Sequence, residues 1–219
     1  MLLYVTLIAC AIVFGVQVYR YDINDREPLP ALILAAVLGA AAMWLAGLAQ
    51  VAIMRNLGPL AADHWNSSMA VVAALTEETA KFTAVVLVIG LRPRWFNDPM
   101  DGLVYGAFAG LGAALEESLV LLSGVDPHVL PATEPVRLAG HLTMGGIAAF
   151  GLSYMKLGRR GWWRRVASGF IAAMALHATW DIVAFDAADR GNMSASHTFA
   201  SMVVMLGGMI IFRAMIRLA

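Results

Sequence analysis

Long apolar stretches dominate this chain. Seven can be distinguished along its 219 residues, each about as long as the ~20 residues that an α-helix needs to cross a bilayer. They cover roughly residues 2–19, 31–53, 69–91, 100–123, 138–155, 166–186 and 199–216. The connections between them are short and leave no room for a soluble domain. The sequence predicts an all-α, polytopic transmembrane helical bundle of about seven spans (eight are also compatible), with residues 1–219 in a single integral membrane domain.

Composition supports this class and excludes others. The chain is 60% hydrophobic and 14% charged, whereas a soluble domain is about 45–50% apolar and 25% charged. Fifteen basic residues balance fifteen acidic ones, so we expect the lipid bilayer, and no nucleic acid, as a partner. The single cysteine, Cys10, excludes an intramolecular disulfide and a cysteine-based zinc site.

The basic residues are distributed unevenly between the loops. Eleven of the fifteen fall in the first, third and fifth loops and at the C-terminal end, and three fall in the alternate loops. Loops rich in Lys and Arg stay in the cytoplasm. We therefore expect the N-terminus outside and the C-terminus in the cytoplasm.

Ionisable residues inside apolar spans are costly, and they usually face a bundle interior or a wet cavity. Here they are Glu77, Glu78, Lys81, Glu116, Glu117, His141, His177 and Asp181. At 1.5 Å per residue, those on four different spans lie roughly 5–13 Å from the outer end. Neighbouring spans run in opposite directions, so their ionisable residues need not lie at similar depths. The similar depths therefore predict one polar cavity that opens toward the extracytoplasmic side.

The spacing of these residues indicates local pairs. Lys81 follows Glu77 by four residues and Glu78 by three, so it can reach either carboxylate on a helix. Asp181 follows His177 by four residues, where it can accept the imidazole N–H and fix the tautomer.

Glycines indicate where helices approach closely. Gly102, Gly106 and Gly110 recur every four residues, a pattern typical of tight helix packing in membranes. Gly145 follows His141 by one turn and would let another backbone come close.

Carboxylates and imidazoles without a nucleophile motif suit the activation of water. A buried glutamate can act as a general base, and histidines can hold the water or donate to an oxyanion. The residues Glu77, Glu116, His141 and His177 could equally hold one divalent metal such as zinc, and the sequence leaves both mechanisms open. Alternative functions are a proton- or cation-coupled transporter that uses the buried acids, and a non-catalytic membrane scaffold. No inverted repeat of the kind typical of transporters is evident.

Four short motifs together resemble the PrsW family of intramembrane proteases over about residues 70–185. They are Glu77-Glu78-x-x-Lys81, residues 98–106 leading to Glu116-Glu117, Arg137 to His141, and His177-x-x-Trp180-Asp181. The chain departs from the family pattern at Glu117, where Asn is more common, and at Ala139, where Pro is common.

This resemblance implies a fold akin to the CAAX prenyl endopeptidases and an intramembrane endopeptidase, a hydrolase of glutamic or metallo type. By resemblance, Glu77 is the water-activating base, supported by Glu78 and Lys81, and His141 orients the water. His177 with Asp181 polarises the scissile carbonyl, Glu116 is a further acid or metal ligand, and the role of Glu117 stays open.

The resemblance also bears on cofactor, substrate and membrane. The glutamic type requires no cofactor, and the metallo type requires one divalent metal such as zinc. The substrate is expected to be a membrane-spanning or membrane-bound protein or peptide, for example an anti-sigma factor. The expected location is a bacterial inner (plasma) membrane.

Overall fold

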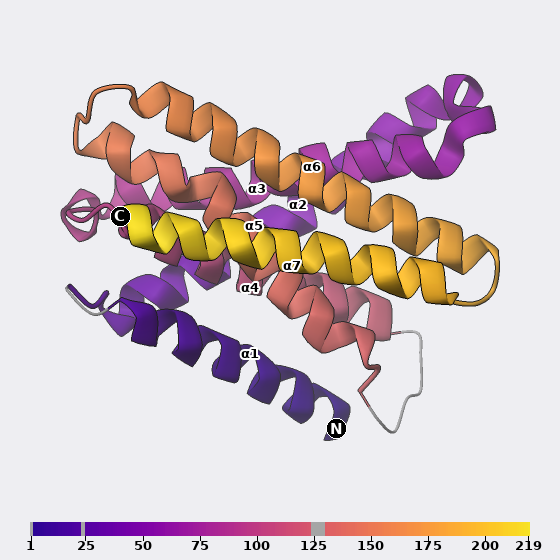
Figure 1. The fold of residues 1–219 in the computed structure, drawn as a ribbon, viewed down its shortest axis with the longest axis horizontal. Coiled ribbons are helices and arrows are strands. Elements are labelled where there is room, and N and C mark those ends of the chain that lie inside the picture. The colour runs from indigo at the N-terminus through magenta and orange to yellow at the C-terminus, as the bar shows by residue number, and fades with distance from the viewer. Residues whose placement is uncertain (1, 23–24, 124–129) are drawn as a thin grey trace.

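The computed structural model describes residues 2–22, 25–123 and 130–219, and these residues form seven α-helices without any strand (Figure 1). The helices are α1 (Leu2–Tyr21), α2 (Leu29–Ala61), α3 (Trp65–Leu91), α4 (Asp101–Leu122), α5 (Thr133–Lys156), α6 (Trp162–Asp189) and α7 (Ala195–Leu218). Short 3₁₀ turns, η1 (Ala62–His64) and η2 (Pro93–Trp95), flank α3. Each helix contains one of the predicted apolar stretches, which confirms the all-α bundle.

Five of the helices are long and apolar enough to cross a membrane: α1, α2 over Leu29–Gly58, α4, α6 and α7. The other two, α3 and α5, have 27 and 24 residues, which is sufficient length for a span. They are less apolar because α3 carries Glu77, Glu78 and Lys81, and α5 carries Glu134 and Arg137. The chain is thus an integral membrane protein whose most polar helices are among its most buried.

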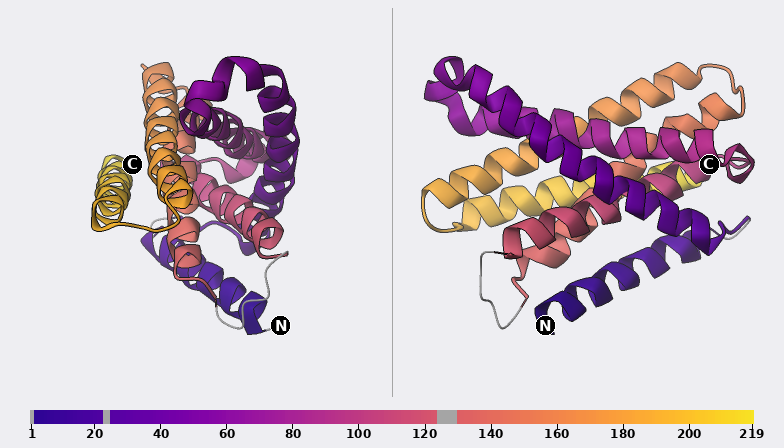
Figure 2. Two further views of the ribbon diagram at one scale, coloured as in Figure 1. Left: turned by 90° about the vertical axis from the view of Figure 1, so that its right-hand side faces the viewer. Right: turned by 180° about the vertical axis from the view of Figure 1, so that it is seen from behind.

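The helices are arranged in antiparallel succession around α4 and α5 (Figure 2). Helix α2 packs on α4 and α6 packs on α5, while α3 lies between α2 and α6 and contacts both of them (Figure 2). Helix α7 packs on α5 and α6, and α1 lies at the edge (Figure 1). The two termini lie at opposite ends of the bundle. With 33 residues, α2 is about 50 Å long, which exceeds the ~30 Å hydrocarbon core, and the α2–α3 hairpin projects beyond the other helices (Figure 1).

The predicted glycine face of α4 packs against α5. A Cβ atom at Gly102, Gly106 or Gly110 would collide with the backbone carbonyl of Ala149, Gly145 or His141 respectively. The two helix backbones therefore touch, as the four-residue spacing predicted. The contact at Gly110 matters most for the site, because it fixes the backbone of His141 against α4.

A small polar cluster closes the end of the bundle at which α4 begins. The hydroxyl of Tyr105 donates to the carboxylate of Glu27, which is buried just before α2. The carboxylate of Asp101 accepts the backbone N–H groups of Asn97 and Asp98 at 2.6 and 2.8 Å. These contacts tie the loops at this end to the first turns of α4.

Candidate active site

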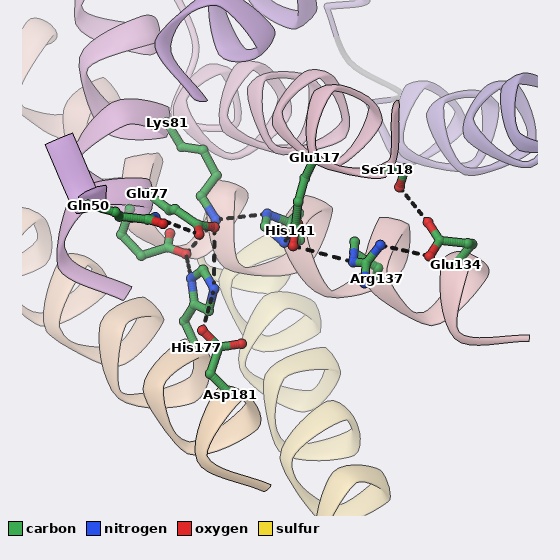
Figure 3. A network of polar contacts seen from close by, with 11 residues as sticks. Gln50, Glu77, Lys81, Glu117, Ser118, Glu134, Arg137, His141, His177 and Asp181 are labelled. Carbon is green, nitrogen blue, oxygen red and sulfur yellow. Dashed lines mark hydrogen bonds and ion pairs between the residues drawn. The ribbon is translucent and has the colours of Figure 1, made fainter. Parts of the chain in front are cut away.

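Side chains from five helices converge on one place in the bundle (Figure 3). They are Gln50 from α2, Glu77, Glu78 and Lys81 from α3, Glu117 from α4, His141 from α5, and His177 and Asp181 from α6. One ligand atom each of Glu77, His141 and His177 lies within 4.8 Å of the others, and all three residues are buried. The structure thus brings together the predicted intramembrane carboxylates and histidines with the exception of Glu116.

Glu78 and Lys81 link the two histidines. Oε1 of Glu78 lies 2.5 Å from Nζ of Lys81 and 2.7 Å from Nδ1 of His177. Nζ of Lys81 also lies 3.3 Å from Nδ1 of His141. Glu78 and Lys81 are fully buried, so these contacts form without competition from water. The two imidazoles are thereby held edge to face, with centroids 5.3 Å apart.

One carboxylate oxygen of Glu77 accepts a hydrogen bond, and the other has no hydrogen-bond partner among the described residues. Nε2 of Gln50 donates to Oε1 at 2.9 Å. Oε2 lies 3.5 Å from Nε2 of His177 and has no hydrogen-bond partner among the described residues. Gln50 was not predicted as a site residue, although it is the one amide in the apolar stretch 31–53. The arrangement leaves Oε2 available to accept a proton or to bind a metal.

The tautomer of His177 is set by a different carboxylate from the one expected. The four-residue spacing favoured Asp181, but its Oδ2 lies 3.4 Å from Nε2, while Glu78 accepts at Nδ1. Asp181 shares the helix face of His177, yet the Nδ1 edge of the ring points across the bundle to α3. Donation from Nδ1 to Glu78 leaves the Nε2 lone pair facing Glu77 and Asp181.

Of the two adjacent glutamates on α4, the structure brings Glu117 into the cluster. Oε2 of Glu117 lies 3.0 Å from Nε2 of His141, and Oε1 lies 3.5 Å from Nε of Arg137. Glu116 is half-buried and has no hydrogen bond or ion pair to any residue that the structure describes. One residue step turns a helix by about 100°, and on α4 this step directs Glu116 away from the partners that Glu117 contacts. The role expected for Glu116 therefore finds no support in this geometry.

Further polar residues extend the cluster along α5 (Figure 3). Arg137 also pairs with Glu134 at 2.7 Å, and Glu134 accepts a hydrogen bond from Ser118 at 2.5 Å. Arg137 was counted as a loop cation because the fifth span was expected to begin at 138. The helix begins at Thr133, which places Arg137 one turn before His141 and within reach of Glu117.

A cavity of about 290 Å³ opens beside this cluster. Its polar wall consists of Glu117, Arg137, His141, His177 and Asp181. The remaining lining is apolar and comes mainly from α6 and α7. A peptide can therefore approach the imidazoles and carboxylates from this side.

The donor set fits a divalent metal. Glu77, Glu78 and Glu117 each have a buried Oε2 that lacks a hydrogen-bond partner within the described part of the chain. Two histidines and one carboxylate are a known ligand set of catalytic zinc, and Glu77, His141 and His177 supply it here. Glu116, also predicted as a ligand, is not part of this set.

Comparison with known proteins agrees with the geometry. Residues 27–212 match the family model described as PrsW family intramembrane metalloprotease. No curated protein and no solved structure matches the chain significantly. The family match spans α2 to α6 completely and α7 as far as residue 212, and it includes every residue of the cluster. The chain thus belongs to the PrsW family of intramembrane metalloproteases.

Proposed function

We propose that this cluster hydrolyses a peptide bond of a membrane-spanning or membrane-bound protein. The observation that carries the proposal is the convergence of Glu77, His141 and His177 within 4.8 Å, with the unpartnered Oε2 of Glu77 facing the ring of His177, which lines the cavity. A general base must lie within hydrogen-bond reach of the water it activates. Transport through the bundle is not favoured, because the family is one of proteases.

In the metal-free form of the mechanism, Glu77 is the base. Its Oε2 takes a proton from a water held at Nε2 of His177, and the water oxygen attacks the scissile carbonyl carbon. The proton then passes to the leaving amine. Lys81 donates to Nδ1 of His141, so the N–H of His141 is at Nε2, 3.0 Å from Oε2 of Glu117. When substrate enters the cavity, this N–H turns from Glu117 to the developing oxyanion. These roles exchange those that the family resemblance implied for the two histidines.

A metallo form uses the same residues differently. Glu77, His141 and His177 would hold the ion, which when bound supplies a water of lowered pKa and polarises the carbonyl. Glu78 would orient His177 through Nδ1, as carboxylates commonly do for metal-bound imidazoles. Glu117, at the cavity wall beside His141 and Arg137, would then be the carboxylate that can hold the proton.

The proposed placement is the outer half of a bacterial inner membrane. The cluster lies toward the end of the bundle that contains the start of α5 and the α6–α7 turn, opposite the loops with most of the basic residues (Figure 1). With those loops in the cytoplasm, the cavity faces the extracytoplasmic side. A transmembrane protein such as an anti-sigma factor is a suitable substrate class.

The test is proteolysis of a panel of single-span membrane peptides by the purified protein in liposomes. We expect Glu77→Gln to lower the cleavage rate by about 10²–10⁴-fold, the usual contribution of a general base. Glu116→Gln is the matched control, because it changes an adjacent helix's glutamate outside the cluster, and it should cleave at the wild-type rate. Equal rates for both variants would remove the proposed site.

A separate measurement tests whether cleavage requires a bound metal. Chelation followed by metal analysis of the dialysed protein separates the two forms. Loss of cleavage that zinc restores, with metal binding abolished in His141→Ala and His177→Ala, supports the metallo form. Cleavage that persists with no bound metal supports the metal-free form.

A further inference from the structure

A row of polar side chains joins α4 to α5 beside the imidazole of His141 (Figure 3). It starts at Ser118, whose hydroxyl donates to Oε2 of Glu134 at 2.5 Å. The other oxygen of Glu134, Oε1, accepts from Nη1 of Arg137 at 2.7 Å. Nε of Arg137 lies 3.5 Å from Oε1 of Glu117, whose Oε2 lies 3.0 Å from Nε2 of His141. Each carboxylate in the row therefore has its two oxygens on two different partners.

The periodicity of α5 places three members of this row on one face of the helix. Glu134, Arg137 and His141 are separated by three and then four residues, the spacing at which helical side chains are neighbours. Helix α4 supplies the other two members, Glu117 and Ser118, from adjacent positions. Arg137 is therefore held by a carboxylate of its own helix and by a carboxylate of the neighbouring one.

The two ends of the row differ in their access to the active-site cavity. Glu117, Arg137 and His141 line this cavity. Ser118 and Glu134 are only 0% and 3% exposed and do not contribute to its wall. A substrate in the cavity cannot touch the buried end, so any influence of Glu134 on hydrolysis has to pass through Arg137.

An arginine suits this place in the row. Its guanidinium is planar and permanently charged, and it offers five N–H donors in fixed directions. An ion pair with Glu134 alone would be an ordinary contact within one helix. The same guanidinium also reaches Glu117 on α4. This second contact connects Arg137 to the site.

The ring of His141 has a charged group at each nitrogen. Nζ of Lys81 lies 3.3 Å from Nδ1. Because an ammonium can only donate, the ring N–H is at Nε2, on the side of Glu117. Oε2 of Glu117 is close to this N–H but has no aligned hydrogen bond among the described residues. The carboxylate therefore directs the imidazole N–H and leaves it able to turn to a substrate.

We propose that Arg137, held by Glu134 and Ser118, is a positioning residue for hydrolysis. It keeps the carboxylate of Glu117 beside Nε2 of His141, and this carboxylate directs the imidazole toward the cavity. When the N–H turns to the oxyanion, the ion pair with Arg137 retains Glu117 in place, so that the ring can return after each turnover. This inference rests on the proposed protease function and adds the residues that control the orientation of His141.

Nitrogen NMR of protein labelled in its histidine side chains tests this row without requiring hydrolysis. The signals of His141 are assigned by their absence in His141→Gln. We expect Arg137→Gln to shift the Nε2 resonance of His141, and Glu134→Gln to shift it less. The matched control is Glu116→Gln, which neutralises a half-buried glutamate of α4 outside the row. It should leave the resonances of His141 at their wild-type positions.

In the active protein, the effect should appear in kcat. Arg137→Gln should lower kcat for a cleaved membrane peptide about 10–100-fold, the usual effect of losing a partner that orients a site residue. Arg137→Lys should recover part of this loss, because an ammonium keeps the charge but lacks the fork that reaches both carboxylates. Glu134→Gln should lower kcat severalfold with KM unchanged, since Glu134 is not part of the cavity wall.

A double-mutant cycle shows whether Arg137 acts through Glu117. If it does, Arg137→Gln should have little further effect on kcat in a Glu117→Gln background, whereas two independent losses would multiply. Multiplied losses would overturn the proposal, and so would resonances of His141 that do not move in Arg137→Gln. Resonance shifts in a protein whose wild-type form cleaves no peptide would instead keep the positioning row and refute the proposed hydrolysis.

Discussion

Oε1 of Glu78 lies 2.7 Å from Nδ1 of His177, and this contact joins α3 to α6 at the centre of the site. The same oxygen is paired with the buried ammonium of Lys81. Glu78 therefore has two roles: it orients an imidazole and it neutralises a buried cation. The adjacent residue Glu77 keeps one carboxylate oxygen without a hydrogen-bond partner among the described residues. Glu78 therefore has a structural role, and Glu77 is left free for a chemical one.

Replacing Glu78 should cost both stability and activity. In Glu78→Gln, Lys81 stays buried without its carboxylate partner, which typically costs about 3–5 kcal/mol. We expect a clearly lower thermal unfolding midpoint in detergent. Asp181→Asn should unfold close to the wild type, because Asp181 is half-buried and its carboxylate lies 3.4 Å from His177.

A double variant separates the two roles of Glu78. Glu78→Gln combined with Lys81→Met removes both charges and should recover most of the lost stability. Its activity should stay well below that of the wild type, because a neutral amide oxygen then accepts from Nδ1 of His177 in place of the carboxylate. Recovery of cleavage together with stability would show that Glu78 acts only by neutralising Lys81.

Gln50→Leu should reduce activity and leave stability nearly unchanged. Gln50 donates to Oε1 of Glu77, and loss of such a supporting hydrogen bond commonly costs 10–100-fold in activity. The expected effect is on kcat for a membrane peptide. Gln50→Glu would instead place a second carboxylate against Glu77, and its activity should be lower still. Wild-type kcat in Gln50→Leu would contradict a positioning role.

The composition of the cluster was predictable in large part, for a physical reason. Charged side chains in an apolar span are tolerated only where they meet partners, so Glu77, His141 and His177 had to converge. The same reasoning applies to Lys81, whose spacing from Glu78 allowed the observed ion pair.

Details that depend on helix rotation could not be predicted. Glu116 and Glu117 differ by a rotation of about 100° around the axis of α4. Which of them faces the site depends on the rotation of α4, and this is fixed by the close contacts of its glycines with α2 and α5. Arg137 was missed because the helix starts five residues earlier than its apolar pattern. Gln50 was missed because an uncharged amide alone in a span gives no spacing to interpret.

Gly110→Ala should disturb the site by displacing the backbone of α5 at His141. The added methyl would collide with the carbonyl of His141, and overpacking of this kind typically costs about 1–3 kcal/mol. We expect a lower unfolding midpoint and reduced cleavage, because the backbone of His141 must shift. Gly47→Ala provides the control. No atom lies within 4 Å of its added methyl, and alanine in a helix is more stable than glycine by about 0.5–1 kcal/mol. A Gly110→Ala protein as stable as Gly47→Ala would refute the close approach of α4 and α5.

Stability should fall as the pH rises on account of Glu27. Burial, with the nearby acidic side chains of Asp101 and Asp22, raises the pKa of the Glu27 carboxyl from 4.5 to about 9. The folded protein therefore keeps this proton at pH values where the unfolded chain has lost it. The stabilisation that the protonated carboxyl provides is complete below pH 4.5 and is lost progressively as the pH rises toward 9.

The measurement is the unfolding midpoint in detergent between pH 5 and pH 9, for the wild type and for Glu27→Gln. The amide keeps a polar group beside the Tyr105 hydroxyl but cannot ionise, so its midpoint should decline less with pH. Because Glu27 lies at the end of the bundle opposite the catalytic cluster, the variant should cleave at the wild-type rate at low pH. Parallel pH profiles for the two proteins would show that Glu27 ionises as freely in the folded state as in the unfolded chain.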